Sequence, residues 1–284
     1  MKGNCALYNF ETDLRESHIY PKFAIKYLKK TGSKYLRNVV EPNKREQDGL
    51  KLYLLSSKAE QEFGIREKWF AEKIFVPYLN GKLSLNYNEN LYYFGISFLW
   101  RILLTQFRTS NELKKQWYYS TLKKVETEWT DFLTKGILPR NYHNINLFFT
   151  DEIITNTTKL KGVDFYLTRT MDSTIVSSPN KSYLFIYGKF SKFIFWSIIK
   201  SPDYGADLYD EEIHPIKGAF DIPQSLEYEP FRIFLGNRIK GFNNLPKANS
   251  EQQKKIEHEI MKNPEKFLKS DVWRSISNDL DLEK

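Results

Sequence analysis

The sequence has a single cysteine, Cys5, among 284 residues. One thiol excludes an intramolecular disulfide framework and a structural zinc site built from several cysteines, and it fits the reducing cytoplasm. Long apolar runs are also missing. The most apolar stretch, residues 91–107, is interrupted by Arg101 and is shorter than the ~20 residues of a membrane-spanning helix. The first residues hold no apolar core of a signal peptide. We therefore expect a soluble cytoplasmic protein with no membrane partner.

Glycine-rich loops are absent as well. The 13 glycines stand singly, and the chain has no Walker loop, Rossmann fingerprint, His-Glu-x-x-His motif or nucleophile elbow. These absences argue against the nucleotide-binding folds and hydrolases that depend on such motifs. What the chain has instead is aromatic residues, with 18 Tyr and 21 Phe, and a net charge of +8. That charge favours an anionic partner, with nucleic acid ahead of a membrane surface.

The hydrophobic pattern predicts an α+β protein in four sections. An N-terminal module covers residues 1–80, a helical region 81–140, a β-rich region 141–248, and a helix with an acidic tail 249–284. Apolar residues recur at helical spacing in four segments: 22–30, 59–75, 92–107 and 111–135. β-branched and aromatic runs then predict strands at 145–149, 165–170, 174–177, 183–187 and 190–199. The last run is also compatible with a helix laid across the sheet.

Two turn signals and the acidic end complete the pattern. Pro77 is expected to end the second helix, and Asn80-Gly81 is a turn signal for a hairpin between Phe75 and Tyr87. The acidic residues after 270 are expected to fray as a tail.

One of the four histidines stands next to a strongly basic segment. His18 precedes an aromatic–aliphatic turn closed by Pro21, and residues 15–45 carry nine Lys or Arg against two acids, a local charge of +7. A histidine beside clustered cations is what a site for phosphodiester chemistry requires. A buried histidine beside a solvated basic helix has the same pattern.

The residues around His18 carry a resemblance to a known family. The chain resembles a group of prokaryotic proteins related to HNH (His-Me finger) endonucleases, over about a quarter of its length. The motifs that carry the resemblance are Ser17-His18-Ile19-Tyr20-Pro21-Lys22-Phe23, Tyr35-Leu36-Arg37, Gln47-Asp48-Gly49, Tyr53-Leu54-Leu55 and Glu60-Gln61-x-Phe63 with Glu67. The resemblance implies that residues 1–80 form a degenerate treble-clef module.

The chain departs from that family at the two zinc-binding Cys-x-x-Cys knuckles. The aligned positions are Cys5 and Tyr8 in the first knuckle, and Ser56 and Ala59 in the second. One thiolate does not hold a tetrahedral zinc ion, so we expect no structural zinc. Packing is expected to replace the metal, with Tyr8, Phe10, Leu55 and Phe63 as the residues that supply it.

The resemblance also implies site residues. In HNH nucleases a histidine acts as general base on water, and a neighbouring group binds a divalent metal ion. His18 is then the catalytic base, and Glu60 with Asp48 holds Mg²⁺ or Mn²⁺; Ser17 stands where the family usually has Asp or His. Nucleic acid, DNA first, is the implied partner. Its backbone would contact Lys22, Lys26, Lys29, Lys30, Lys34, Arg37, Lys44 and Arg45.

The family context further implies a role in antiviral defence and a protein partner such as an ATPase subunit. Plainer interpretations stay open beside these. His18 is also compatible with a buried histidine that donates to a carbonyl near Pro21. Glu60 and Glu67 are compatible with ordinary acids on a helix surface, and the lysines with a solvated helix face. The alternatives to an endonuclease are a catalytically inactive descendant that binds DNA, RNA or protein, and an interaction protein that uses its aromatic C-terminal half.

Overall fold

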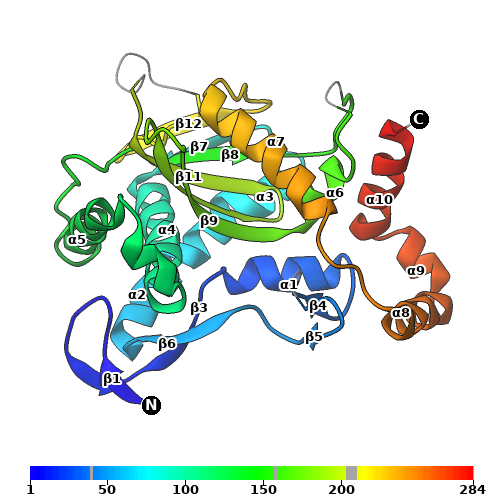
Figure 1. The fold of residues 1–284 in the computed structure, drawn as a ribbon, viewed down its shortest axis with the longest axis horizontal. Coiled ribbons are helices and arrows are strands. Elements are labelled where there is room, and N and C mark those ends of the chain that lie inside the picture. Colours follow the sequence, from blue (N-terminus) through cyan, green and yellow to red (C-terminus); the bar gives the residue numbers. More distant parts are fainter. Residues whose placement is uncertain (39–40, 157–158, 203–209, 284) are drawn as a thin grey trace.

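The computed structural model describes residues 1–38, 41–156, 159–202 and 210–283. It has the mixed α+β fold that the sequence predicts, with helices packed around small antiparallel sheets (Figure 1). Within the described ranges, no helix is both long and apolar enough to cross a lipid bilayer.

A four-stranded antiparallel sheet lies at the centre. Its strands run in the order β8 (Asn146–Phe149), β11 (Phe193–Lys200), β10 (Leu184–Phe190) and β9 (Met171–Ser177). Successive side chains of a strand point to opposite faces. Along β10, Leu184 and Ile186 accordingly join one hydrophobic cluster, whereas Phe185 and Tyr187 join another. Both faces of the sheet are therefore buried.

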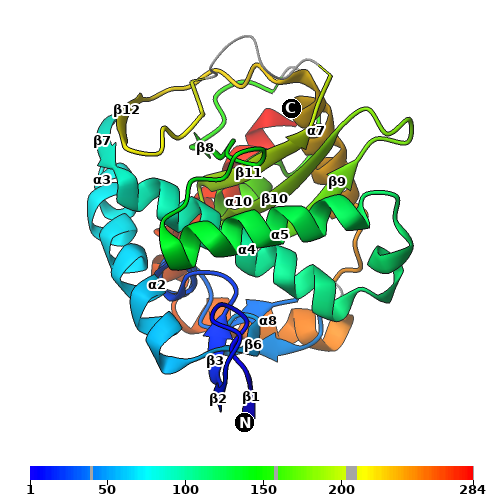
Figure 2. The same cartoon turned by 90° about the vertical axis from the view of Figure 1, so that its left-hand side faces the viewer.

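One long helix covers each face. Helix α4 (Glu89–Thr109) lies against one face and α7 (Glu229–Asn243) against the other (Figures 1 and 2). On the α7 side, Phe231 stacks on Trp196 with ring centroids 4.2 Å apart. On the α4 side, a Cβ atom at Gly188 would lie 2.2 Å from the Cδ1 of Ile102. Only glycine at this position lets α4 approach the sheet so closely.

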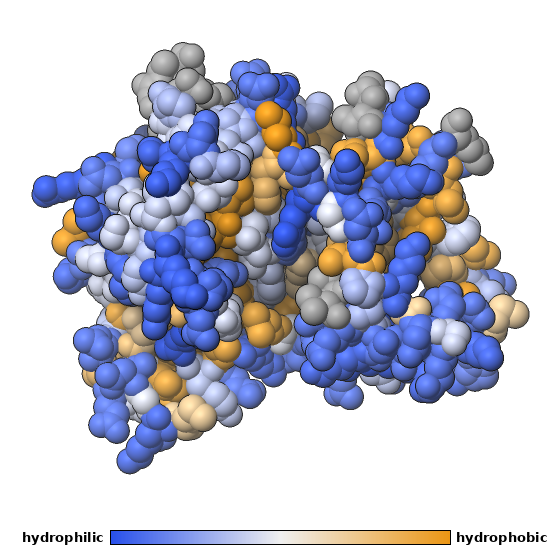
Figure 3. Space-filling view, in the orientation of Figure 1, coloured by the Kyte–Doolittle hydropathy of each residue, from blue (hydrophilic) through white to orange (hydrophobic). Residues whose placement is uncertain are grey.

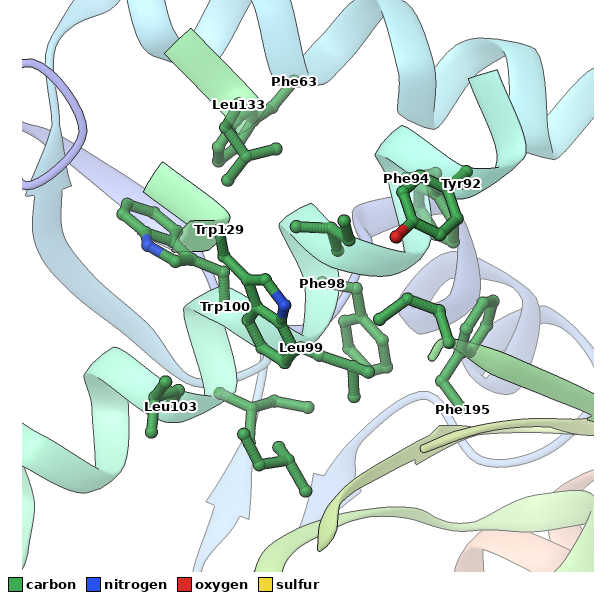
Figure 4. Close-up of a cluster of buried hydrophobic side chains, with 14 of the residues drawn as sticks. Phe63, Tyr92, Phe94, Phe98, Leu99, Trp100, Leu103, Trp129, Leu133 and Phe195 are labelled. Atoms are coloured by element: carbon green, nitrogen blue, oxygen red, sulfur yellow. The ribbon is translucent and has the colours of Figure 1, made fainter. Parts of the chain in front are cut away.

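Helix α4 is buried among further helices. It contacts α2 (Ser57–Phe70) and α5 (Tyr119–Lys135) as well as the sheet. Figure 4 shows Trp100 and Trp129 in the cluster between these elements. The indole N–H of Trp100 donates to the Thr130 hydroxyl over 3.0 Å, so this buried polar group is satisfied. The helix predicted over residues 92–107 is confirmed, and it lies within α4.

The N-terminal elements form a layer below this core. Strands β1 (Lys2–Asn4) and β2 (Glu11–Asp13) make a hairpin, and β3 (Arg15–His18) pairs with β6 (Lys51–Leu55). Helix α1 spans Lys22–Lys30, as predicted, and buries Ala24, Ile25 and Leu28. Two short strands, β4 (Leu36–Arg37) and β5 (Arg45–Glu46), lie in the loop that follows.

The prediction for residues 75–87 was wrong. The second helix continues through a π-helical turn, Ala71–Phe75, into α3 (Val76–Leu79), with Pro77 in the first turn of α3. Proline has no backbone N–H, so Pro77 donates no helical hydrogen bond of its own. Asn80-Gly81 ends α3, and β7 (Ser84–Asn88) pairs with the distant β12 (Lys217–Asp221) instead of forming a local hairpin.

Other local predictions were overturned by distant contacts. The strand predicted at 165–170 is wrong, because residues 165–169 lie in helix α6 (Val163–Arg169). Residues 193–200 form strand β11, so the alternative of a helix over 190–199 is also wrong. The helix predicted over 111–135 starts as a 3₁₀ turn, Asn111–Lys115, before α5. After α8 (Ser250–Lys262) and α9 (Pro264–Leu268), the acidic end is helix α10 (Asp271–Leu282) and not a frayed tail. Asp279 accepts the backbone N–H groups of Asp164 and Phe165 at 2.8 and 2.9 Å.

One hydrophobic cluster extends over the first three predicted sections, from Cys5 to Phe220. Helix α10 packs on α6, which ties the last section to the β-rich one. The boundaries at residues 80, 140 and 248 stay predictions.

Candidate functional site

Antiparallel pairing of β3 with β6 positions His18. The register places His18 opposite Lys51, and Asp48 lies three residues before Lys51. The Nε2 atom of His18 lies 3.0 Å from Oδ1 of Asp48. The same carboxylate accepts the backbone N–H of Gly49 at 3.0 Å and pairs through Oδ2 with Lys51 Nζ at 2.8 Å. The structure thus brings together two of the predicted site residues, His18 and Asp48.

These contacts fix the charge on Asp48. Burial alone would raise the pKa of its carboxyl group, but the hydrogen bonds from Lys51, His18 and Gly49 outweigh burial and hold this pKa well below its ordinary value. Asp48 is therefore an anion at neutral pH and orients the imidazole through a charge-assisted hydrogen bond. The His18 side chain is 17% exposed and that of Asp48 37%, so the pair lies at the surface.

The backbone at His18 is held from the other side by Arg101 of α4. The Nη1 atom of Arg101 donates to the carbonyl oxygen of His18 at 2.9 Å and pairs with Glu67 Oε1 at 2.7 Å. The Arg101 side chain is only 4% exposed. In the sequence, Arg101 stood out only as an interruption of an apolar run, so its contact with the backbone of His18 was not predicted. A charged residue at a buried helix position was the signal that pointed to it.

Glu60, the second predicted metal ligand, lies elsewhere. It is in the first turn of α2, which follows Leu55, and Leu55 pairs with Arg15 at the far end of the β3–β6 ribbon from His18. No hydrogen bond or ion pair among the described residues joins Glu60 to His18 or Asp48. The described residues also contain no cluster of three or more His, Cys, Asp or Glu side chains suited to a metal ion.

The two former knuckle positions meet in space. Cys5, fully buried in the β1–β2 turn, accepts the backbone N–H of Ser56 at 3.2 Å through its Sγ atom. The Ser56 hydroxyl accepts the N–H of Ala59 at 3.2 Å and caps α2. Hydrogen bonds thus connect positions that the resemblance assigns to zinc ligands.

Packing around these positions follows the sequence prediction in part. Leu55 and Phe63 are buried, as expected. Tyr8 is half-buried and hydrogen-bonded to Glu62. Phe10 is 43% exposed, so its predicted place in the core was wrong.

The predicted basic residues fall into two groups. On α1, cations line the exposed side of the helix, and Lys29 donates to the carbonyl of Gln47 at 2.6 Å. In the following loop, Lys44 pairs with Glu41 at 3.7 Å and Arg45 with Glu259 at 2.8 Å. The cations that form no ion pair with a described residue are Lys22, Lys26, Lys29, Lys30, Lys34 and Arg37.

Helix α8 adds cations that the sequence prediction did not connect with this segment. Arg37 contacts Gln252 at 3.5 Å, and the side chain of Asn43 accepts the N–H of Asn249 at 2.9 Å. Lys254, Lys255 and Lys262 of α8 lie around an open pocket shared with Arg45. Figure 3 shows hydrophilic side chains gathered over this part of the molecule. We call these cations, together with the eight predicted ones, the basic surface. The basic surface is formed by segments that the fold brings together, and no sequence motif marks it.

Comparison with known proteins adds no relative: no family model, no curated protein and no solved structure matches this chain.

Proposed function

We propose that this protein binds nucleic acid along the basic surface and hydrolyses phosphodiester bonds at the His18–Asp48 pair. The observation that carries the proposal is the 3.0 Å contact between Nε2 of His18 and Oδ1 of Asp48. His18 also lies four residues before Lys22, where the basic helix α1 begins. Cations at this distance along the chain would hold a phosphate backbone beside the imidazole.

The chemistry of the pair suits a general base. In the tautomer in which Nε2 donates its proton to Asp48, the Nδ1 atom keeps a lone pair that can take a proton from water. Asp48 fixes that tautomer and stabilises the imidazolium that forms, which is the role of a carboxylate behind a catalytic histidine. Arg101 is a positioning residue, because it holds the backbone of His18 and does not reach the reacting atoms.

A divalent ion shared by Asp48 and Glu60 does not fit this arrangement. The oxygens of Asp48 already accept hydrogen bonds from His18, Gly49 and Lys51, and Glu60 lies beyond the other end of the ribbon. Dependence of activity on Mg²⁺ or Mn²⁺ stays a prediction from the family resemblance, and no step proposed for His18 uses a metal ion.

The separation of Glu60 from His18 favours a second candidate function, a non-catalytic nucleic-acid-binding protein. Such a protein would use the same basic surface. The contact between Cys5 and Ser56 supports ancestry in the zinc-containing family under both proposals, because it joins the two knuckle positions.

One set of assays separates these functions. Labelled single- and double-stranded DNA and RNA are incubated with the wild type, with His18→Ala and with His143→Ala, in Mg²⁺, in Mn²⁺ and in EDTA. His143 is an exposed histidine outside the site and serves as the matched control. We expect cleavage by the wild type and His143→Ala, and loss of cleavage in His18→Ala with unchanged binding. Equal cleavage by the wild type and His18→Ala would rule out the catalytic assignment.

Binding is tested through its salt dependence. The affinity of a protein that contacts several phosphates falls steeply with salt. Replacing Lys22, Lys26 and Lys30 by Glu should weaken binding and reduce the slope of log K against log salt by about three. Glu substitutions at Lys114 and Lys124, exposed lysines at and near α5 on the side of the molecule opposite α8 (Figure 1), are the control. Binding that is indifferent to salt would contradict both candidate functions.

A further inference from the structure

A second pocket lies behind the basic surface. It has a volume of about 460 Å³ and is enclosed by the turn after α1, the β4 segment, the junction of α6 and β9, the end of α7 and the start of α10. Its volume falls in the range of about 300–1,000 Å³ that is typical of small-molecule sites. Five segments that are far apart in the sequence build it, so only the tertiary fold creates it.

The walls of this pocket are largely apolar and partly aromatic. Phe165 of α6 and Phe242 of α7 stack with ring centroids 6.3 Å apart and planes inclined by 25°, and both line the pocket with Tyr35 and Leu245. Flat aromatic side chains at a half-open wall are the surfaces on which nucleobases stack.

The charges of the pocket are of one sign. Arg37, Arg169 and Lys247 line it, and none of the described lining residues is acidic. The guanidinium group of Arg169 already has partners within the protein. It donates to the Thr31 hydroxyl at 2.8 Å and to the carbonyl of Leu28 at 3.0 Å, and it forms an ion pair with Asp271 at 3.6 Å. Arg37 and Lys247 form no ion pair with any described residue and are therefore open to an anion.

Arg37 also connects the pocket to the basic surface. Its Nη1 atom donates to the carbonyl of Pro42 at 2.9 Å and contacts Gln252 of α8 at 3.5 Å. No described residue accepts from its Nε or Nη2 atom. A phosphate bound by Arg37 would thus lie where the basic surface meets the apolar pocket, which has the size of one nucleotide.

We propose that this pocket binds a single nucleotide, with the base against Phe165, Phe242 and Tyr35 and the phosphate at Arg37 and Lys247. This proposal rests on the proposed function. It adds that the group recognised on a nucleic acid is a terminal or unpaired nucleotide. A free mononucleotide has the same chemistry, and the test distinguishes the two sources.

The test measures binding of adenosine, guanosine, cytidine and uridine monophosphates to the full chain by calorimetry, with the nucleosides and inorganic phosphate as separate probes. Short single strands with and without a 5′-phosphate are measured in parallel. The variants are Lys247→Glu, in which an exposed pocket residue changes sign, and Lys240→Glu, an exposed lysine of α7 outside the pocket as matched control. Leu245→Trp fills the pocket and is used after its folding has been checked by circular dichroism.

We expect mononucleotides to bind at least tenfold more tightly than nucleosides or phosphate alone. Lys247→Glu should weaken this binding about tenfold, Leu245→Trp should abolish it, and Lys240→Glu should leave it within twofold. A preference for strands over free mononucleotides identifies a strand end as the ligand, and the reverse preference identifies a free nucleotide; both support the pocket.

Absence of mononucleotide binding, or binding that Lys247→Glu and Leu245→Trp leave unchanged, would overturn the pocket proposal. If long oligonucleotides still bind with a steep salt dependence in that case, the proposed function stands without the pocket. If mononucleotides bind but long oligonucleotides do not, the pocket stands and the proposed function fails.

Discussion

The backbone N–H of Ser56 donates to the sulfur of Cys5 over 3.2 Å, although the two residues are 51 positions apart. This contact holds the β1–β2 turn against the start of α2. Both residues are buried, and the Ser56 hydroxyl also caps the helix. Ser56 therefore makes a long-range contact through its backbone and a local helix cap through its side chain.

Ser56→Ala should destabilise the protein. The substitution removes the cap on the N–H of Ala59 and the hydroxyl beside Cys5, and the loss of an N-cap costs about 0.5–2 kcal/mol. Urea denaturation measures the change in the free energy of unfolding. Ser57→Ala, whose hydroxyl accepts only an exposed hydrogen bond from Arg15, is the control and should change stability by no more than ~0.5 kcal/mol. Equal effects of the two variants would contradict the capping role.

Asp48→Asn should remove a pH-dependent part of the stability. The folded pKa of Asp48 lies below its ordinary value, so its contribution is present above the unfolded pKa of about 3.9 and is lost as pH falls below it. The wild type should therefore be more stable than Asp48→Asn at pH 7, and the difference should shrink below pH 4. Thermal denaturation from pH 3 to 7 measures it. A difference that does not change with pH would show that the ion pairs of Asp48 contribute nothing.

Glu211→Gln should stabilise the protein at alkaline pH. Glu211 is 1% exposed, its Oε1 has no hydrogen-bond partner among the described residues, and burial raises the pKa of its carboxyl group to about 7. A raised carboxyl pKa favours folding at low pH, and this advantage is lost as pH rises from about 4.3 to 7. The variant should exceed the wild type by roughly 2–3 kcal/mol at pH 8 and match it near pH 4.

Chemical denaturation at several pH values tests this expectation for Glu211. Glu229→Gln, at an exposed position, is the control and should bring no stabilisation at alkaline pH. A wild-type profile for Glu211→Gln would mean that Glu211 is ionised in the folded state without cost.

Lys189→Met should destabilise the protein by about 2–4 kcal/mol. Lys189 is fully buried in β10, and its Nζ atom donates to the carbonyls of Tyr166, Thr170 and Ser191 at 2.8, 3.0 and 2.9 Å. Burial lowers the pKa of Lys189 to about 7. Methionine fills a similar volume but removes all three hydrogen bonds. The carbonyls of Tyr166 and Thr170 keep the Thr170 hydroxyl and the Ser191 N–H as donors, whereas the carbonyl of Ser191 loses the ammonium donor.

The same denaturation assay measures the effect of Lys189→Met, with the exposed Lys217→Met as control. A stability equal to that of the wild type would show that other donors, such as water, replace the ammonium group.

Local patterns predicted the elements whose structure is set by their own residues. Helix α1 begins and ends where the apolar spacing and the flanking Pro21 and Gly32 place it, and the end of α5 at Gly136, with φ of +70°, follows from the freedom of glycine to adopt a left-handed conformation. The charge of the segment 15–45 was likewise fixed by the sequence, because charge does not depend on the fold.

Elements that depend on distant partners were not predictable from local pattern. Residues 163–169 are rich in β-formers, yet they form α6 because Asp279 of α10 accepts the first N–H groups of this helix, 115 and 114 residues away. The acidic end is ordered for the same reason. Tertiary hydrogen bonds and packing outweigh propensities that differ by less than about 1 kcal/mol per residue.

The sequence by itself determined the mixed α+β composition, the single thiol, the basic N-terminal segment and the candidate histidine. Only the tertiary structure decided what these residues contact. The register of β3 against β6 gives His18 the carboxylate of Asp48 and leaves Glu60 at the far end of the ribbon. The fold also brings α8 beside the basic segment and encloses the pocket behind it. Charge and propensity belong to single residues, whereas a site is a set of distances, and long-range packing fixes those distances.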